Sequence, residues 1–147
     1  MTPPLTVPVV RLDENLDLPS YARAGDAGLD LVARHGAVLQ PAGGRALVAT
    51  GIAFALPEGY AAFVQPRSGL ALRHGVTVLN SPGLIDSGYR DELKVLLVNL
   101  DPIEPFRIDR GDRIAQLVVQ AVAEVQWAPT DSLHGANRGG GFGSTGR

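Results

Sequence analysis

The 147-residue chain is 45% hydrophobic, contains no cysteine and carries a formal net charge of −2. Its length predicts a single domain, and its weak acidity excludes the clustered Lys and Arg that a nucleic acid polymer needs for its phosphates. The lack of cysteine excludes disulfides, thiolate metal sites and a cysteine nucleophile, and without a signal pattern or a membrane-length apolar run we expect a soluble cytoplasmic protein that contacts no membrane.

The 18 glycines and 11 prolines divide the chain into short apolar runs separated by turn signals. Such spacing predicts an all-β sandwich or barrel. Leu93–Leu100 is apolar almost throughout, so we expect both of its faces to be covered. The one predicted helix is Ser68–Arg73, with Ser68 as its N-cap and an end before Gly75. The predicted strands are Val7–Leu12, Leu29–Ala33, Arg45–Ala49, Tyr60–Val64, Val76–Leu79, Leu93–Leu100, Phe106–Ile108, Arg113–Val119 and Ala123–Trp127.

The first polar segment, AGDAGLDL at Ala24–Leu31, places two carboxylates on the glycine-rich start of a strand. Asp26 is equally well explained by hydrogen bonds within a turn. Asp30 precedes an apolar strand, and we expect it at the edge of a pocket, where carboxylates hold the water molecules of a hydrated Mg²⁺.

The next segment, Gln65–Ala71, combines a cation, a hydroxyl and the start of the predicted helix. Arg67, Ser68 and the free backbone N–H groups of a first helical turn would form a phosphate site. An ordinary helix start with a solvated Arg67 is the alternative. The segment lacks the Gly-x-x-x-x-Gly-Lys pattern of a P-loop, so ATPase chemistry is not implied.

The segment Asn80–Lys94, NSPGLIDSGYRDELK, predicts a tight hairpin. Pro82 and the neighbouring glycine form one turn, and Gly88 permits a second bend. Asp86 and Tyr89 therefore project from a rigid backbone and form a plausible pocket for a small planar ligand. The alternative is a surface hairpin in which Asp86 only caps a turn.

In the segment Gly111–Val118, GDRIAQLV, Gln116 interrupts an apolar strand. A buried amide needs hydrogen-bond partners, so Gln116 is either satisfied within the sheet or turned towards a ligand. The three histidines, His35, His74 and His134, lack the spacing of metal ligands, and we expect them on the surface.

The composition changes after Trp127, which we expect in the core. From Pro129 onward the chain is rich in Pro, Thr, Ser, Gly and Asn, which predicts a disordered terminus. A sharper hypothesis is that this tail folds over a nucleotide. Gly139–Gly141 would then offer N–H groups to phosphates, Arg138 would pair with them, and Phe142 would stack on a base.

Taken together, the five segments resemble the five motifs of trimeric dUTP pyrophosphatases, the dUTPase family. The resemblance extends over nearly the whole chain, and its central hairpin is highly specific. It implies an all-β, jelly-roll-like homotrimer whose active sites are shared between subunits, with a domain at residues 1–128 and a flexible glycine-rich arm at 129–147 that closes over the site. The matching segments are AGDAGLDL at 24–31, PRSGLA at 66–71, GLIDSGYRDEL at 83–93, GDRIAQLV at 111–118 and RGGGFGSTG at 138–146.

The resemblance implies hydrolysis of dUTP to dUMP and pyrophosphate, which keeps uracil out of DNA and supplies dUMP for thymidylate synthesis. Asp86 would be the general base for the water that attacks the α-phosphorus. A Mg²⁺ ion would be held by the triphosphate and by water, with Asp30 as a nearby catalytic acid residue.

The other implied residues contact the substrate. Asn80, Leu84 and Ile85 would read uracil, and Tyr89 would lie under the sugar and exclude a 2′-hydroxyl. The phosphates would be held by Arg67, Ser68, Gly69 and Gln116, with Lys94 assisting near the hairpin. Arg138 would clamp the γ-phosphate, and Phe142, followed by Gly143, would stack on uracil.

One feature of the tail departs from the family pattern. Arg138 and Phe142 are one residue closer together than the corresponding pair usually is. Unless the glycine run absorbs this difference, both cannot sit as the resemblance implies. The intact Phe-Gly-Ser-Thr-Gly run makes Phe142 and Gly143 the firmer assignments.

Three alternatives remain open. A dCTP deaminase has a similar fold, but it needs an acid–base Glu and normally lacks the aromatic glycine-rich tail. A non-catalytic nucleotide-binding trimer would not need the carboxylate of Asp86. A β-module without a ligand would leave the polar segments unexplained.

Overall fold

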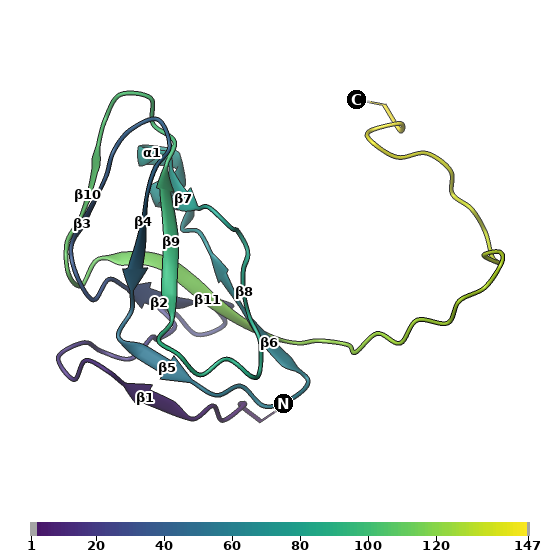
Figure 1. The fold of residues 1–147 in the computed structure, drawn as a ribbon, viewed down its shortest axis with the longest axis horizontal. Helices are drawn as coiled ribbons and strands as arrows, with labels where there is room; N and C mark the ends of the chain where they lie inside the picture. Colours follow the sequence, from purple (N-terminus) through teal and green to yellow (C-terminus); the bar gives the residue numbers. More distant parts are fainter. Residues whose placement is uncertain (1–2, 147) are drawn as a thin grey trace.

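The computed structural model describes residues 3–146, so positions 1, 2 and 147 of the expected domain and arm lie outside the described residues. Between residues 3 and 146 it contains eleven strands and one short helix, which confirms the all-β prediction (Figure 1). No helix in this range is long and apolar enough to span a membrane. The elements are β1 (Val9–Arg11), β2 (Leu29–Val32), β3 (Ala37–Leu39), β4 (Gly44–Ala49), β5 (Ile52–Phe54), β6 (Tyr60–Gln65), α1 (Ser68–His74), β7 (Val76–Val78), β8 (Gly83–Ile85), β9 (Lys94–Asn99), β10 (Phe106–Ile108) and β11 (Arg113–Ala121).

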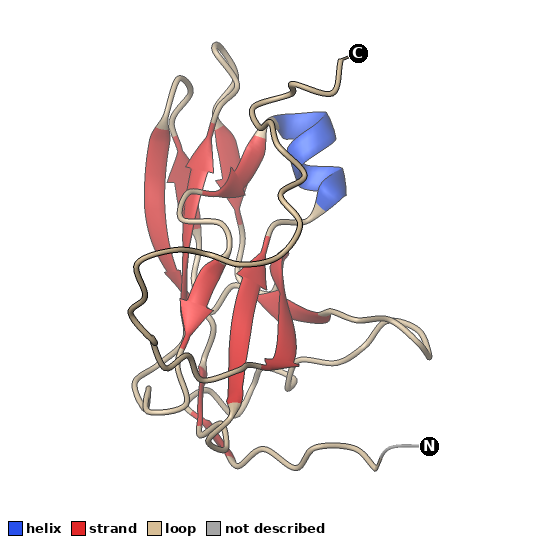
Figure 2. Ribbon diagram, turned by 90° about the vertical axis from the view of Figure 1, so that its right-hand side faces the viewer, coloured by secondary structure: helices blue, strands red, loops and turns tan. Residues whose placement is uncertain are grey.

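Two antiparallel sheets enclose the core. One has the strand order β2-β11-β6-β8 and the other β4-β9-β7, while β1-β5 and β3-β10 form two-stranded pairs. The helix lies at one end of the strands (Figure 2). Apolar side chains from both sheets meet in one cluster that includes Leu31, Val64, Leu97 and Leu117. Burial of such side chains from water is the main force that holds the layers together.

Strand β9 lies in the middle of its sheet and is covered on both faces, as its apolar run predicts. Val95, Leu97 and Val98 are all buried. Asn99 at its end is also fully buried, and its amide is satisfied. Its Nδ2 donates to two backbone carbonyls at 3.1 and 2.8 Å, and its Oδ1 accepts an N–H at 2.9 Å.

The helix starts at Ser68, as the predicted range does, but its N-cap lies one residue earlier than predicted. Arg67 is the N-cap and makes no side-chain capping bond, so the prediction of Ser68 as N-cap is wrong. The reason is that Arg67, with φ −93° and ψ 127°, still has extended backbone, and Ser68 is already the first helical residue. The predicted end before Gly75 is confirmed, because Gly75 adopts the left-handed conformation that closes a helix.

The predicted strand Ala123–Trp127 does not form within this chain, and the prediction that Trp127 belongs to the core is wrong. Val122 donates its N–H to the carbonyl of Gly59 at 2.9 Å, and the chain then leaves the sheet. Beyond that point the segment has no strand partner within residues 3–146, and Trp127 is 86% exposed. Its apolar character did not indicate that it would lie outside the core of this chain.

Candidate active site

Four of the five polar segments meet on one sheet. Asp30 lies on β2, Gln116 on β11 and Arg67 just beyond the end of β6, while the hairpin supplies β8. The antiparallel register places Gln116 opposite both Asp30 and Gln65. Strand pairing thus brings Asp30 next to Gln116, although the two are 86 positions apart in the sequence.

Asp30 lies between two arginines. One of its carboxylate oxygens is 3.6 Å from Nε of Arg67, and the other is 3.6 Å from Nη1 of Arg113. Arg67 also donates a hydrogen bond from Nη1 to the carbonyl of Arg113 at 3.3 Å. With two cations and one carboxylate, this group has a net positive charge and a partly fixed guanidinium, which suits it to binding an anion.

Gln116 is held in place by the segment that precedes the helix. Its Nε2 donates to the carbonyl of Pro66 at 3.0 Å, so one amide hydrogen is satisfied within the protein. Gly28, just before the neighbouring strand β2, leaves room for this amide, because a Cβ there would overlap Oε1 and lie 3.2 Å from the Cβ of Gln116. The side chain is therefore fixed at the sheet surface and half-buried.

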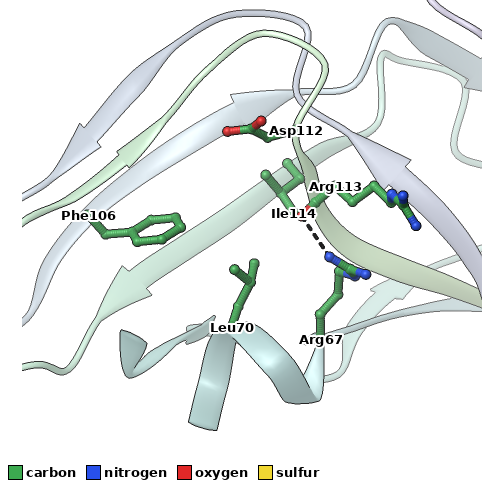
Figure 3. A pocket seen from close by; sticks show the side chains of 6 residues that line it. All are labelled: Arg67, Leu70, Phe106, Asp112, Arg113 and Ile114. Atoms are coloured by element: carbon green, nitrogen blue, oxygen red, sulfur yellow. Dashed lines mark hydrogen bonds between the residues drawn. The ribbon is translucent and has the colours of Figure 1, made fainter. Parts of the chain in front are cut away.

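A pocket of about 340 Å³ opens beside Arg67, between α1, β10 and β11 (Figure 3). Leu70 from the helix and Phe106 from β10 lie at its apolar side, and Arg67 lies at the helix start. Ser68 is exposed and Gly69 half-buried in the first helical turn. The residues lining the pocket are Arg67, Leu70, Phe106, Asp112, Arg113 and Ile114.

The hairpin starts against the edge of β6. Gly83 pairs with Val64, and a Cβ on Gly83 would lie 3.2 Å from the Cβ of Val64 and 3.6 Å from Nδ2 of Asn80. Asn80 therefore sits next to the start of β8. In the strand itself, Ile85 packs against the core, whereas Leu84 is 57% exposed and does not.

Asp86 and Tyr89 form a tight turn after β8. The N–H of Tyr89 donates to the carbonyl of Asp86 at 3.1 Å, and the Tyr89 hydroxyl donates to the carbonyl of Glu92 at 2.9 Å. Within residues 3–146 the Asp86 carboxylate accepts no hydrogen bond and forms no ion pair, so it does not cap the turn. By contrast, the Asp26 carboxylate does bind within its turn, accepting the N–H of Arg23 at 2.9 Å.

A single chain does not bring the hairpin acid to the arginine group. Gly83 pairs with Val64, so the preceding residue, Pro82, is level with Gln65, which itself pairs with Gln116. Asp86 is four residues further along, which at the rise of a strand is about 13 Å. Lys94 is exposed at the start of β9, on the other sheet.

The predicted residues of the tail also lie apart from the sheets. After β11 the chain extends away from the body (Figure 1). Arg138, Phe142 and Gly143 are all exposed, and Phe142 projects fully into solvent with a positive φ of 50°. The bonds of this segment are local, such as that from the N–H of Gly141 to Oγ of Ser144 at 2.9 Å.

The donor groups suit an ion that brings ligands of its own. No cluster of three or more His, Cys, Asp or Glu side chains within residues 3–146 has the arrangement of a metal site, and the histidines are exposed, as predicted. Asp30, the carboxylate that pairs with Arg67 beside the pocket, faces two guanidinium groups. An ion held chiefly by phosphate oxygens and water fits such a surface better than one held by a protein cage.

Sequence comparison matches residues 14–146 to the dUTPase family model. The deoxyuridine 5′-triphosphate nucleotidohydrolase of Thermobifida fusca is 59% identical over 141 residues, 95% of this chain and 78% of that protein. The protein of the same name from Corynebacterium glutamicum is 52% identical over 148 residues, covering 100% of this chain and 99% of that one.

Solved structures give the same result for the fold. A dUTPase variant of Staphylococcus bacteriophage 80alpha with dUpNHpp superposes with a TM-score of 0.84 at 25% identity, covering 96% of this chain and 98% of that chain. A phage phi11 dUTPase variant, described for its coordination of a structural Mg(II) ion, has a TM-score of 0.79 at 24% identity, covering 89% and 100% of the two chains. The architecture is thus a jelly-roll-like β-fold shared with these proteins.

Proposed function

The chain belongs to the dUTPase family, and we propose that it hydrolyses dUTP to dUMP and pyrophosphate. The observation that carries this proposal is the match along almost the entire chain to relatives named for that activity. The geometry is compatible with it, because a free carboxylate and a positively charged anion site are both present. The biological consequence would be removal of dUTP before it is incorporated into DNA and a supply of dUMP for thymidylate synthesis, in the cytoplasm, where nucleotides are made.

In this proposal Asp86 is the general base. Its carboxylate takes a proton from a water molecule, whose oxygen forms a bond to the α-phosphorus while the bond from that phosphorus to the bridging oxygen breaks and pyrophosphate leaves. The absence of internal partners for Asp86 within residues 3–146 supports this role, since an unpaired acceptor is free to bind water. Base assistance of this kind contributes about 10²- to 10⁴-fold.

The phosphates would bind to the group around Arg67. Ser68, Gly69 and Gln116 would supply further donors, and Arg67 is already oriented by its bonds to Asp30 and to the backbone of β11. A Mg²⁺ ion bound to the triphosphate would neutralise phosphate charge and fix its geometry. Asp30 would hold the waters of that ion while it orients the arginine.

The base and sugar would be recognised by the hairpin. Asn80 and the backbone at Leu84 and Ile85 would read the uracil edge, and the hairpin, paired with β6, would leave no room for a thymine methyl group. Tyr89, held by its hydroxyl bond, would lie under the deoxyribose. Lys94 would assist from the base of the hairpin.

We propose that residues 1–128 form the catalytic domain and that the arm at 129–147 closes over bound substrate. Arg138 would reach the γ-phosphate, and Phe142, followed by Gly143, would stack on uracil. Full exposure of the Phe142 ring supports this, because burying it on a base would remove a large apolar surface from water. Closure would exclude bulk water from the reaction.

We further propose a homotrimer with shared sites. The separation of about 13 Å between Asp86 and the row of Gln116 supports it, because base and phosphate ligands from one chain would not meet. Val125 and Trp127, at alternate positions of an unpaired segment, are 66% and 86% exposed. An apolar groove of about 470 Å³ beside Val9 and Phe54 offers a surface that such a segment could cover.

Complementation tests the shared site. Asp86→Asn and Arg67→Met chains should each be inactive, but mixed oligomers of the two should contain some sites with both residues intact and regain activity. Light scattering should give three times the mass of one chain. Activity that never recovers on co-expression, with mixed oligomers verified by mass, would contradict sharing.

Product analysis tests the activity itself. The wild-type chain with Mg²⁺ should convert dUTP to dUMP and pyrophosphate and leave dTTP and dCTP intact. Asp86→Asn should lose about 10²- to 10⁴-fold in kcat, whereas Asp91→Asn, an exposed carboxylate in the same segment, should not. Release of ammonia from dCTP would indicate the deaminase alternative, and nucleotide binding without turnover would indicate a non-catalytic binder.

A further inference from the structure

Glu92, which has no assigned role, anchors the far end of the hairpin. Its carboxylate accepts two contacts from Nη1 of Arg34, at 2.8 and 3.2 Å, and the N–H of Gly51 at 3.2 Å. Both side chains are partly shielded from solvent, Glu92 being 16% and Arg34 35% exposed. Three bonds to a shielded carboxylate hold this residue more firmly than a typical surface pair.

Arg34 is itself fixed from several directions. Its Nη2 donates to the carbonyl of Leu12 at 2.9 Å, and its Nε lies 3.5 Å from the carboxylate of Asp13. Arg110 donates to Asp13 and, at 2.7 Å, to the carbonyl of Arg34. The ion pair thus ties the hairpin to the loops that follow β1, β2 and β10.

The backbone next to Glu92 is equally constrained. Leu93 is buried, donates to the carbonyl of Ile52 at 2.8 Å and accepts both the N–H and the hydroxyl of Thr50. The segment between β8 and β9 passes beside β5 at this point (Figure 1). The carbonyl of Glu92, one residue earlier, is the acceptor of the Tyr89 hydroxyl at 2.9 Å. One residue therefore connects the ion pair to the aromatic ring.

We propose that the Arg34–Glu92 ion pair is a positioning element that fixes the ring of Tyr89 and thereby sets the preference for deoxyribose over ribose. The inference rests on the proposed function, in which Tyr89 lies under the sugar. An oxygen added at C2′ is rejected only if the ring cannot move away from it. Releasing Glu92 frees the carbonyl that holds the ring, so the ring yields and UTP is admitted.

The test compares kcat/KM for dUTP and UTP in Glu92→Ala, Arg34→Met and a control. Arg107→Met is the matched control, because it removes an ion pair of 2.8 Å with Asp109 between two exposed side chains on another strand. In both ion-pair variants, Glu92→Ala and Arg34→Met, the dUTP:UTP preference should fall about tenfold. The control should retain the wild-type preference.

A double variant tests the route through the ring. Tyr89→Phe, which removes the hydroxyl bond, should also lower the preference, and adding Glu92→Ala should lower it no further. An unchanged preference in folded Glu92→Ala and Arg34→Met, or full additivity in the double variant, would overturn the inference. If the Ala and Met variants do not fold by circular dichroism, Glu92→Gln and Arg34→Lys replace them under the same criterion.

Binding separates this inference from the proposed function. Calorimetry with dUpNHpp and its ribose counterpart measures the sugar preference without turnover. If the wild-type chain binds dUpNHpp selectively but hydrolyses nothing, the proposed reaction fails while the role of Glu92 is still tested by the variants. If the variants bind the two analogues with the wild-type ratio, the inference fails although hydrolysis stands.

Discussion

Gly28 offers a direct test of the proposed phosphate site, because the side chain of that site which a Cβ on Gly28 would meet is Gln116. It precedes β2, and a Cβ placed on it would overlap Oε1 of Gln116 and lie 3.2 Å from both Cβ and Cδ of that side chain. Its φ lies outside the left-handed region, so alanine is acceptable to the backbone. The substitution Gly28→Ala therefore acts by crowding one amide.

The expected loss can be worked from the contacts. Gln116 cannot retreat as a whole, because β11 is paired with β2 at this position. The amide must rotate and give up its 3.0 Å bond to the carbonyl of Pro66, about 1 kcal/mol, together with a charge-assisted bond to phosphate of about 1.5–3 kcal/mol. Because the Pro66 bond is lost in the free enzyme as well, only the phosphate bond counts, and about 1.5–3 kcal/mol corresponds to a decrease in kcat/KM for dUTP of about 10- to 150-fold.

Steady-state kinetics of Gly28→Ala, Gln116→Ala and the double variant provide the assay. Gln116→Ala removes the crowded group, so the double variant should be no worse than Gln116→Ala alone. Wild-type kcat/KM in Gly28→Ala would refute the reasoning, as would a double variant that loses the sum of both effects.

Three further outcomes are expected. Asn99→Ala leaves one buried and two partly buried backbone groups without their partner and should cost about 2–4 kcal/mol, seen as a melting temperature lower by about 5–15 °C in circular dichroism. The hydrogen bond from Arg110 lowers the pKa of Asp13 from 3.8 to about 2, so its stabilising effect should be complete above about pH 4 and be lost as the pH falls through 2. In acid titrations, the free energy of unfolding of Asp13→Asn should consequently lack the loss that the wild-type chain shows between about pH 4 and pH 2. Insertion of one glycine between Arg138 and Phe142 should lower the KM for dUTP by restoring the family spacing. An unchanged or higher KM would show that the arm closes over the substrate as well with the shorter glycine run.

Much of the fold follows from local patterns in the sequence. Apolar runs and turn residues locate β6, β9 and β11, and the helix ends where Gly75 requires it. The three-residue strands β3 and β5 were not predicted, although β10, which is equally short, was. Trp127 was misassigned because hydrophobicity indicates that a side chain will be covered, but not whether its own chain covers it.

The sequence predicts which residues belong to the candidate site better than it predicts the contacts between them. Asp30 and Gln116 stand out as polar residues on apolar strands and Arg67 as a cation at a helix start, and the structure brings them together. Arg113 could be noticed in the sequence only as part of the polar segment Gly111–Val118. Its contact with Asp30 occurs where the strand register is irregular, between Arg113 and Ala115. Glu92 and Arg34 are 58 residues apart, and no local pattern links them.

The distance between Asp86 and the group around Arg67 on one sheet limits how the proposed reaction can take place. The proposed base and the proposed phosphate ligands lie on one sheet, and the pairing of β8 with β6 holds Asp86 about 13 Å from the row of Gln116. Hydrolysis at the α-phosphorus requires both at one substrate, since the attacked atom lies between the sugar and the pyrophosphate. The same β-framework that keeps these groups apart in one chain therefore makes association with another copy a condition of the proposed chemistry. The exposed side chains of Val125 and Trp127 are available for such a contact.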